Sequence, residues 1–182
     1  MTYVALLRGI NVGGNRKVEM AKLKLTFERL GLMHVKTFIA SGNVVYVTDD
    51  HNEAALTSRI EAAIEADFGF PVATLLRNLD EIAAVIKTIP EHWVTDKVMK
   101  CDVLFLWPTI DSPDVLKQIP TNPEIEDLFY VPGAAVNRID RSNATKGRVA
   151  GIIGTNLYKQ MTVRNANSVR KIYNLMLTAN SS

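Results

Sequence analysis

The sequence predicts an α+β fold of duplicated ferredoxin-like units, each with the order βαββαβ, an antiparallel sheet and helices packed on one face. Three observations predict it. Segments with strand and helix periodicity alternate in that order over the first half of the chain. Similar segments recur in the second half. Arg-Asn at 77–78 also recurs 87 positions later (164 minus 77), and apolar residues at helical spacing follow both copies.

These matches indicate an internal duplication with halves at 1–91 and 97–182, which we expect to form one compact structural unit. The stretch around Trp93 joins the halves. Each half therefore needs its own set of strands and helices. The apolar residues that match between the halves are Ile82, Val85 and Ile86 in the first and Val169, Ile172 and Tyr173 in the second.

In the first half, an apolar strand over residues 3–8 runs into a loop at 9–14 that contains three glycines. A helix follows, because apolar side chains recur every three or four residues, and Gly31 supplies its left-handed stop. Two β-rich runs at 35–40 and 44–48 surround Ser41-Gly42-Asn43, which is typical of a tight hairpin. The apolar residues of that helix are Met20, Leu23, Phe27 and Leu30.

A second helix has an apolar stripe from Leu56 to Phe68 and begins after Asp49, Asp50 and Asn52, whose side chains can cap it. A strand at 72–77 completes the βαββαβ order. One more helix is expected at 78–89, because Asn78 and Glu81 have the spacing of a capping box.

The second half repeats this order. We expect a strand at 103–107, a short helix at 113–119 and a hairpin of 127–131 and 134–139 around Pro132-Gly133. Residues 146–158 have a helix-like pattern despite three glycines, each of which costs roughly 1 kcal/mol relative to alanine. A strand at 161–164 and a final helix end the chain.

The composition excludes several classes of protein. With 182 residues, 47% hydrophobic and 22% charged, the chain has enough apolar surface to fold compactly. No stretch approaches the roughly 18 apolar residues of a membrane span. The first residues do not resemble a signal peptide, so we expect a cytoplasmic protein without membrane partners. Cys101 is the single cysteine and cannot form an internal disulfide.

The formal net charge of +2 hides a strong segregation along the chain. Residues 1–36 have seven Lys/Arg against two Asp/Glu, giving +5. Residues 37–136 have six against sixteen, giving −10, and residues 137–182 have eight against one, giving +7. Such segregation favours a cationic surface and an anionic partner.

The loop at 9–17 is the leading candidate site. A glycine-rich connection between a strand and a helix can direct backbone N–H groups at an anion, and the helix N-terminus adds a favourable dipole. Alternatively, the glycines only supply turns with positive φ. The ligand-binding residues predicted here are Arg8, Asn11, Gly13, Gly14 and Lys17.

Two further segments have neutral hydrogen-bonding groups. Ser41 and Asn43 form the hairpin turn, or they face the first loop, since the first two strands of a split βαβ unit run parallel and end at the same edge. Asn165 and Asn167 either cap the last helix or bind a ligand together with Arg164. Arg8 and Arg164 would hold one anion only if the repeats pack suitably.

No metal site or cofactor is expected. His34, His51 and His92 lack metal-ligand spacing, and Asp49-Asp50-His51 reads as a helix start. The glycine loop matches neither the dinucleotide fingerprint nor the Walker loop, which argues against both kinds of nucleotide chemistry. No nucleophile or general base can be identified, so whether the protein is an enzyme stays open.

The motifs resemble those of a bacterial family of unknown function, domain-of-unknown-function family 1697. Residues 6–14 match its LLRGINVGG opening, residues 41–44 its SGNV hairpin and residues 162–165 its TxRN segment, although Ala166 stands where many relatives have Trp. The resemblance covers essentially the whole chain. It implies duplicated ferredoxin-like units and implies no activity.

The best functional hypothesis is a binder of an anionic, phosphate-bearing ligand, a nucleotide or nucleic acid, through the first loop. A metal-independent enzyme acting on a phosphorylated small molecule is an alternative, with arginines as charge stabilisers. A non-enzymatic protein-interaction module is a third. The fold alone does not choose among them.

Overall fold

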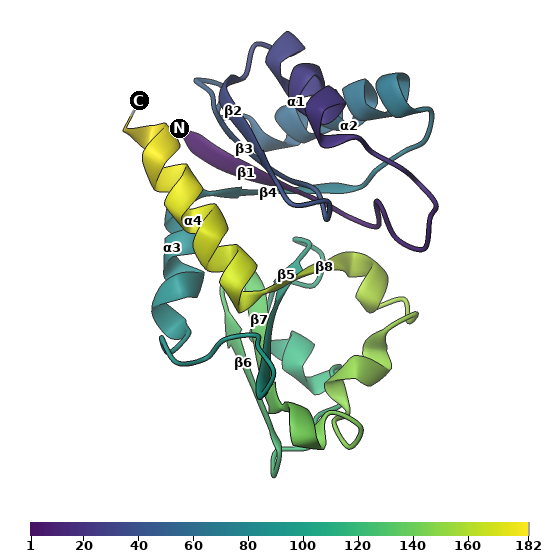
Figure 1. Cartoon of the computed structure of the whole chain (residues 1–182), viewed down its shortest axis with the longest axis vertical. Helices are drawn as coiled ribbons and strands as arrows, with labels where there is room; N and C mark the ends of the chain where they lie inside the picture. The colour runs from purple at the N-terminus through teal and green to yellow at the C-terminus, as the bar shows by residue number, and fades with distance from the viewer. Residues whose placement is uncertain (182) are drawn as a thin grey trace. The chain divides into compact units, whose positions relative to one another are not determined.

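The computed structural model describes residues 1–181, and in that part of the chain the fold is α+β, with two four-stranded antiparallel sheets and four α-helices (Figure 1). The sheet orders are β2-β3-β1-β4 and β6-β7-β5-β8. Each strand of the first sheet therefore has a counterpart four numbers later in the second. This correspondence confirms the predicted α+β class with two antiparallel sheets.

The first sheet has the strand order of a split βαβ unit. Its central strand β1 pairs antiparallel with β3 and β4, and β3 pairs antiparallel with β2. Strands β1 and β2 therefore run parallel, as expected. The bounds of the elements are β1 Thr2–Leu7, α1 Met20–Arg29, β2 Met33–Phe38, β3 Asn43–Val47, α2 Glu53–Phe68 and β4 Thr74–Asn78.

Helices α1 and α2 cover one face of this sheet, as Figure 1 shows. All six residues of β1 are buried, and alternate side chains from Tyr3 to Leu7 pack with Phe27 of α1 and Ile60 of α2 in one hydrophobic core. Alternation follows from the period of two in a strand, which sends every second side chain to the same face. The core therefore fixes the end of β1, where the candidate loop begins.

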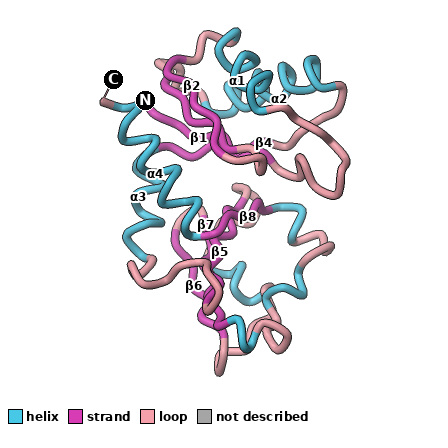
Figure 2. Tube along the Cα trace, viewed as in Figure 1, coloured by secondary structure: helices cyan, strands magenta, loops and turns pink. Residues whose placement is uncertain are grey.

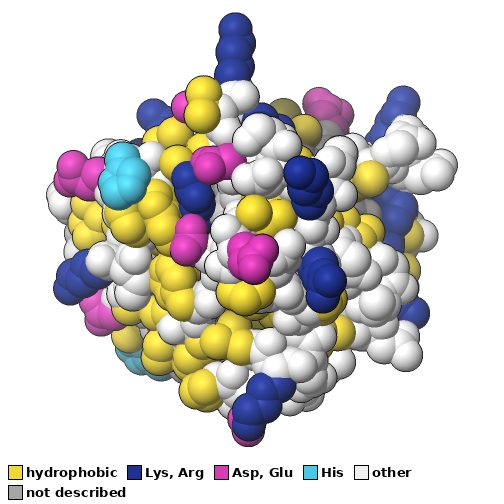
Figure 3. Space-filling view, turned by 90° about the horizontal axis from the view of Figure 1, so that it is seen from below, with side chains coloured by type: hydrophobic (Ala, Val, Ile, Leu, Met, Phe, Trp, Pro, Cys, Tyr) yellow, Lys and Arg dark blue, Asp and Glu magenta, His cyan; other side chains and the backbone are white. Residues whose placement is uncertain are grey.

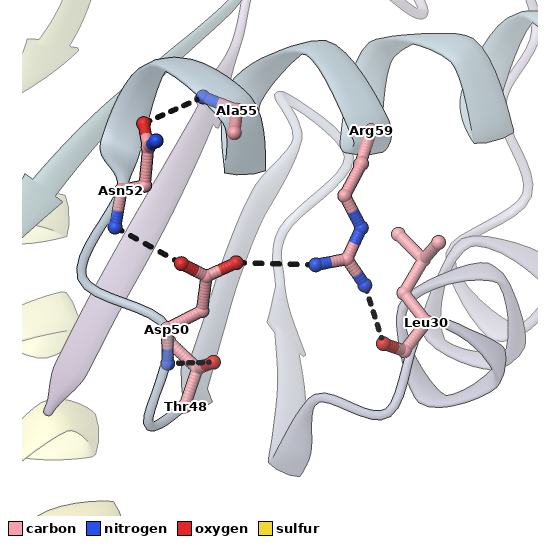
Figure 4. Close-up of polar contacts among 6 residues, drawn as sticks. All are labelled: Leu30, Thr48, Asp50, Asn52, Ala55 and Arg59. Carbon is pink, nitrogen blue, oxygen red and sulfur yellow. Dashed lines mark hydrogen bonds and ion pairs between the residues drawn. The ribbon is translucent and has the colours of Figure 1, made fainter.

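The start of α2 is a network of capping interactions (Figure 4). Asn52 is the N-cap and its Oδ1 accepts from the N–H of Ala55 at 3.1 Å. Asp50 accepts from the N–H of Asn52 and from Arg59, which also donates to the carbonyl of Leu30. The Asp49-Asp50-His51 segment is thus a helix start, and Arg59 ties α2 to the end of α1.

The second sheet repeats the pairing of the first, since β5 pairs antiparallel with β7 and β8, and β7 with β6. Its apolar core lies on one face and includes Leu104 and Leu106 of β5 with Val149 and Ile152. The bounds of the elements in the rest of the chain are α3 Leu79–Thr88, β5 Met99–Leu106, β6 Glu126–Val131, β7 Ala134–Asp140, β8 Met161–Asn165 and α4 Ala166–Asn180.

The helix expected over 146–158 is wrong. After β7 the chain forms three short 3₁₀ turns, Arg141–Asn143, Val149–Ile152 and Tyr158–Gln160, joined by loops (Figure 2). The glycines explain the difference, because Gly154 has a φ of +87°, which no helix continues through. The short helix expected over 113–119 is likewise a 3₁₀ turn, at Pro113–Lys117.

Contacts divide the chain into two compact units. The first unit comprises Met1–Asp80 with Ile172–Ser182, and the second comprises Glu81–Lys171. These bounds differ from the sequence halves at 1–91 and 97–182, because most of α3 groups with the second unit and the later part of α4 with the first. Thr2 Oγ1 donates to Asn180 Oδ1 at 2.9 Å inside the first unit.

Candidate functional site

The glycine-rich loop folds as a small hairpin of its own. The N–H of Asn11 donates to Arg16 O at 3.1 Å, and the N–H of Asn15 donates to Val12 O at 3.2 Å. Gly13 and Gly14 occupy the two central turn positions with φ of +61° and +78°. A type I′ turn requires positive φ at both, which accounts for this pair of glycines.

The glycine turn is separate from the start of helix α1. The helix begins at Met20, five residues beyond Asn15, and its N-cap is Glu19, whose side chain makes no capping hydrogen bond. A carboxylate at this place competes with an anion for the helix dipole. The expected help from the helix N-terminus is therefore weaker than the sequence pattern indicates.

Asn11 connects this loop to the β2–β3 hairpin. Its Nδ2 donates to Ala40 O at 2.8 Å and to Val18 O at 3.0 Å, and its Oδ1 accepts from the N–H of Val18 at 2.8 Å. The residue has a φ of +54°, which Asn tolerates better than most residues. The loop and the hairpin thus lie together at one end of the sheet, as the parallel strands β1 and β2 require.

The cations of the loop differ in their surroundings. The guanidinium of Arg16 donates to Pro71 O and lies 5.2 Å from the ring centroid of Phe70, so it fastens the loop to the segment before β4. Lys17 is exposed. Arg8 is half-buried just after β1, and its backbone N–H donates to Ala73 O. Lys17 is the cation of this group most open to an approaching ligand.

An open surface pocket lies beside the glycine turn. Lys17 and Glu19 are among its lining residues, and so is Gly14, which has no atom within 4 Å of the position where a Cβ would stand. A ligand can therefore approach the turn backbone closely. The lining residues are Asn11, Gly14, Asn15, Lys17, Val18, Glu19 and Ala40.

Ser41 and Asn43 belong to the neighbouring hairpin, where the turn spans 39–42 and Asn43 already lies in β3. Asn43 is fully buried, and its Nδ2 donates to Phe38 O at 2.9 Å and to Ser41 Oγ at 3.2 Å. Gly42 accepts from the N–H of Leu7 at 2.9 Å. The amide of Asn43 therefore holds the hairpin in shape.

The second-unit candidates also have structural partners. Asn165 Oδ1 accepts from the N–H of Ser168, as an N-cap does, and Asn167 bonds both the N–H and the carbonyl of Thr95. Arg164 is buried and donates to Thr162 Oγ1 and Val163 O. Desolvation lowers its pKa to about 10.

The second unit contains a cavity that the sequence pattern did not indicate. It lies between the β5–β7–β8 face and the segment 144–158, and it measures about 150 Å³. Five lining residues have polar side chains, and the rest are apolar or glycine; the polar ones are Lys100, Asp102, Glu126, Asn137 and Tyr158. In the sequence, only the polar residues at core-facing strand positions could have indicated this cavity. Those positions are recognised as core-facing only once the strand register is known.

The described part of the chain lacks the groups expected for a metal site or a membrane span. Within residues 1–181, no cluster of three or more His, Cys, Asp or Glu residues has the geometry to hold a metal ion. No helix there has the length and apolarity needed to cross a bilayer. On the face drawn in Figure 3, Lys and Arg stand beside Asp and Glu at the left and centre, whereas at the right they stand mostly among uncharged groups.

Comparisons with known proteins place the chain in a family. No curated protein matches it. Its fold is similar to the solved structure of conserved bacterial protein SP0830 from Streptococcus pneumoniae, with 28% sequence identity and a TM-score of 0.81 over 96% of this chain and 98% of that one. The family model described as protein of unknown function, DUF1697, matches residues 1–136. The chain therefore belongs to the DUF1697 family of proteins of unknown function.

Proposed function

We propose that the protein binds a phosphate-bearing ligand, a nucleotide or a nucleic acid, at the loop surface of the first unit. The loop surface is formed by Arg8, Asn11, Gly13, Gly14 and Lys17. The observation that carries the proposal is that the exposed Gly13–Gly14 turn, which has no side chains, lies beside the exposed Lys17 and an open pocket. Backbone N–H groups and an ammonium are the groups that proteins use to hold phosphate oxygens.

Four of the five loop-surface residues have distinct parts in this proposal. Lys17 supplies a point charge to the phosphate, and the Gly13–Gly14 turn lets an oxygen approach the main chain. Asn11 positions the loop against Ala40. Glu19 lines the same pocket and brings a negative charge to it, so a ligand with a single weak charge is disfavoured there.

The remaining candidates support the surface rather than touch the ligand. Ser41 and Asn43 shape the hairpin that Asn11 contacts, and the side chains of Asn165 and Asn167 are engaged with Ser168 and Thr95. Arg164 is buried in the second unit. We therefore assign these residues to the framework of the protein, with the ligand held by the first unit.

The test is a binding titration with pyrophosphate, a nucleoside triphosphate and a short single-stranded RNA, on wild type and on Lys17→Ala. We expect at least fivefold weaker binding for Lys17→Ala. The matched control is Lys24→Ala, an exposed lysine of α1, which should bind as wild type does. Absence of binding by all three probes, or equal loss in both variants, overturns the proposal.

The same titration distinguishes a nucleotide from a nucleic acid. Binding of RNA through several phosphates releases counterions, so its affinity should fall steeply between low and moderate salt. Binding of one triphosphate should fall less steeply, because fewer phosphates are neutralised. If RNA binds more tightly than the triphosphate and its affinity falls more steeply with salt, the ligand is a nucleic acid. If only the triphosphate binds tightly, the ligand is a nucleotide.

A further inference from the structure

The two units differ at one cross-strand pair in their cores. In the first unit Tyr3 faces Tyr46 across β1 and β3, and their rings stack with centroids 6.0 Å apart. Tyr3 lies four residues before Leu7, which pairs with the first residue of β4. Counting in the same way from Leu106, which pairs with the first residue of β8, reaches Asp102.

Asp102 faces Asn137 across β5 and β7. Two small polar side chains therefore stand in the second unit where the first has a stacked pair of aromatic rings. At this pair of strand positions the second core thus lacks two aromatic rings. Hydrogen-bonding side chains of the sheet face the space that the rings would fill.

The two units also differ in the segment that packs over this pair of strand positions. In the first unit α2 packs on the sheet with Leu56, Ile60 and Ile64 fully buried. In the second unit the corresponding segment after β7 is a series of 3₁₀ turns, and the cavity of about 150 Å³ lies beneath it. A cavity of about this volume accommodates one benzene-sized ring.

The walls of this cavity are mostly apolar, which suits a ring with little charge. Alternate residues of β5 and β7 form the floor, and the segment 144–158 forms the rim. Ala144, Ala150 and Ile153 of the rim are exposed, so the cavity is open to small molecules. The apolar lining residues are Leu104, Ile139, Ala144, Gly147, Val149, Ala150, Ile152, Ile153 and Val163.

The polar groups of the cavity leave hydrogen-bond acceptors unused. Glu126 is saturated, because its two oxygens accept from the N–H groups of Asn122, Arg148 and Val149. Asn137 is 93% buried and donates through Nδ2 to Asp127 O, while its Oδ1 has no donor within residues 1–181. One oxygen of Asp102 pairs with Lys100 at 3.0 Å. Asn137 Oδ1 is therefore an acceptor at the cavity lining that a ligand N–H can bond in place of solvent.

We propose that this cavity binds a small planar ring that carries N–H donors on one edge. The ring occupies the level at which the first unit stacks Tyr3 on Tyr46, and the donor edge faces Asn137 and Asp102. This is a second site, in the second unit, and it does not depend on the phosphate site. The chemical class is a six-membered nitrogen heterocycle with an exocyclic amino group.

The test compares 2-aminopyrimidine with 2-methylpyrimidine, which has the same shape without the donor. Binding of both is followed by amide chemical shifts in labelled protein, up to about 10 mM, the range expected for ligands of so few atoms. We expect the amino compound to bind up to about tenfold more tightly, the upper end of what one net hydrogen bond contributes. The largest shifts should fall on residues of β5, β7 and 144–158.

Two variants locate the binding. Asn137→Leu has nearly the same size without the acceptor and should reduce the preference for the amino compound, leaving only the part that Asp102 contributes. Ala150→Trp at the exposed rim should block both compounds, whereas Ala54→Trp, at an exposed position of α2, should not. Lys17→Ala should leave binding of the ring unchanged, which separates this site from the phosphate site.

Three outcomes overturn the proposal. They are no saturable shift with 2-aminopyrimidine, equal affinity for the two compounds in wild type, and unchanged binding in Ala150→Trp. Thermal unfolding of each variant shows that it is folded. If Asn137→Leu is misfolded, two results still test the proposal. They are the comparison of the two compounds in wild type and the binding of both compounds to Ala150→Trp.

Discussion

Asn11 and Ala40 are joined by a hydrogen bond of 2.8 Å from Nδ2 to the carbonyl, which links the glycine-rich loop to the β2–β3 hairpin. The same amide bonds Val18 on both its N–H and its carbonyl. This side chain thus ties the loop surface to the hairpin and to the segment before α1. The loop is consequently a feature of the fold as well as a candidate site.

Replacing Asn11 should destabilise the first unit. Asn11→Ala removes three hydrogen bonds and places Ala at a φ of +54°, so we expect a loss of about 2–4 kcal/mol in the free energy of unfolding, measured in urea. Asn15→Ala, at an exposed position of the same loop, is the control and should change stability by less than about 0.5 kcal/mol. Equal effects of the two would contradict the assigned role of Asn11.

Gly42 should tolerate substitution less well than Gly31. Both have a φ of +81°, but a Cβ at Gly42 would stand 2.6 Å from Ile10 Cδ1 and 2.8 Å from Leu7 Cβ, whereas Gly31 has nothing within 4 Å. We expect Gly42→Ala to cost about 3–4 kcal/mol and Gly31→Ala about 1–2 kcal/mol. Thermal or urea unfolding decides, and similar costs would show that the hairpin does not pack closely on Ile10.

The contribution of Asp67 to the stability of the first unit should be lost at low pH. Its carboxylate accepts from Thr26 Oγ1 and from Arg29, both at 2.5 Å, and these hydrogen bonds hold its pKa below the ordinary value for Asp. A lowered folded-state pKa adds stability above the unfolded-state pKa, and this stability is lost as the pH falls through the folded-state pKa.

The measurement is urea unfolding at neutral pH and at successively lower pH below about 4, near the unfolded-state pKa of Asp. Asp67→Asn should be less stable than wild type at neutral pH, and the difference should shrink as the acid protonates Asp67. The control is Asp114→Asn at an exposed site beside Lys117. A constant difference between Asp67→Asn and wild type at every pH would refute the role of the charge.

Cys101 should react slowly in the folded protein. The residue is fully buried, and burial raises the pKa of its thiol to about 11, so about one thousandth is thiolate at pH 8. We expect labelling by a thiol reagent to be slow in buffer and complete in urea. Introducing an exposed thiol with Val98→Cys should give rapid labelling of one thiol per chain, and rapid labelling of wild type would be inconsistent with the buried site.

The strands and first helices followed from local patterns. Glycine and asparagine marked the turns, and spacing of Met20, Leu23 and Phe27 marked α1, because both signals come from residues near one another in the chain. The meeting of the first loop with the hairpin followed from the parallel direction of β1 and β2.

Other features depend on contacts between distant residues. The segment 146–158 has apolar residues at helical spacing, yet its glycines and its packing on the second sheet favour 3₁₀ turns. The role of Asn11 depends on a carbonyl 29 positions later, and that of Asn167 on Thr95, 72 positions earlier. A single sequence contains no pattern that pairs such distant residues. The structure was therefore needed to show that Asn11 and Asn167 connect separate segments of the chain.

The central claim, that the Gly13–Gly14 turn and Lys17 hold a phosphate, is tested most directly by following backbone amide resonances during a titration with pyrophosphate. Gly133, the glycine of the β6–β7 turn, has a φ of +86° and serves as the internal comparison. The account predicts saturable shifts of the Gly13, Gly14 and Lys17 amides with Gly133 unchanged. No shift at the first loop, or an equal shift at Gly133, would contradict it.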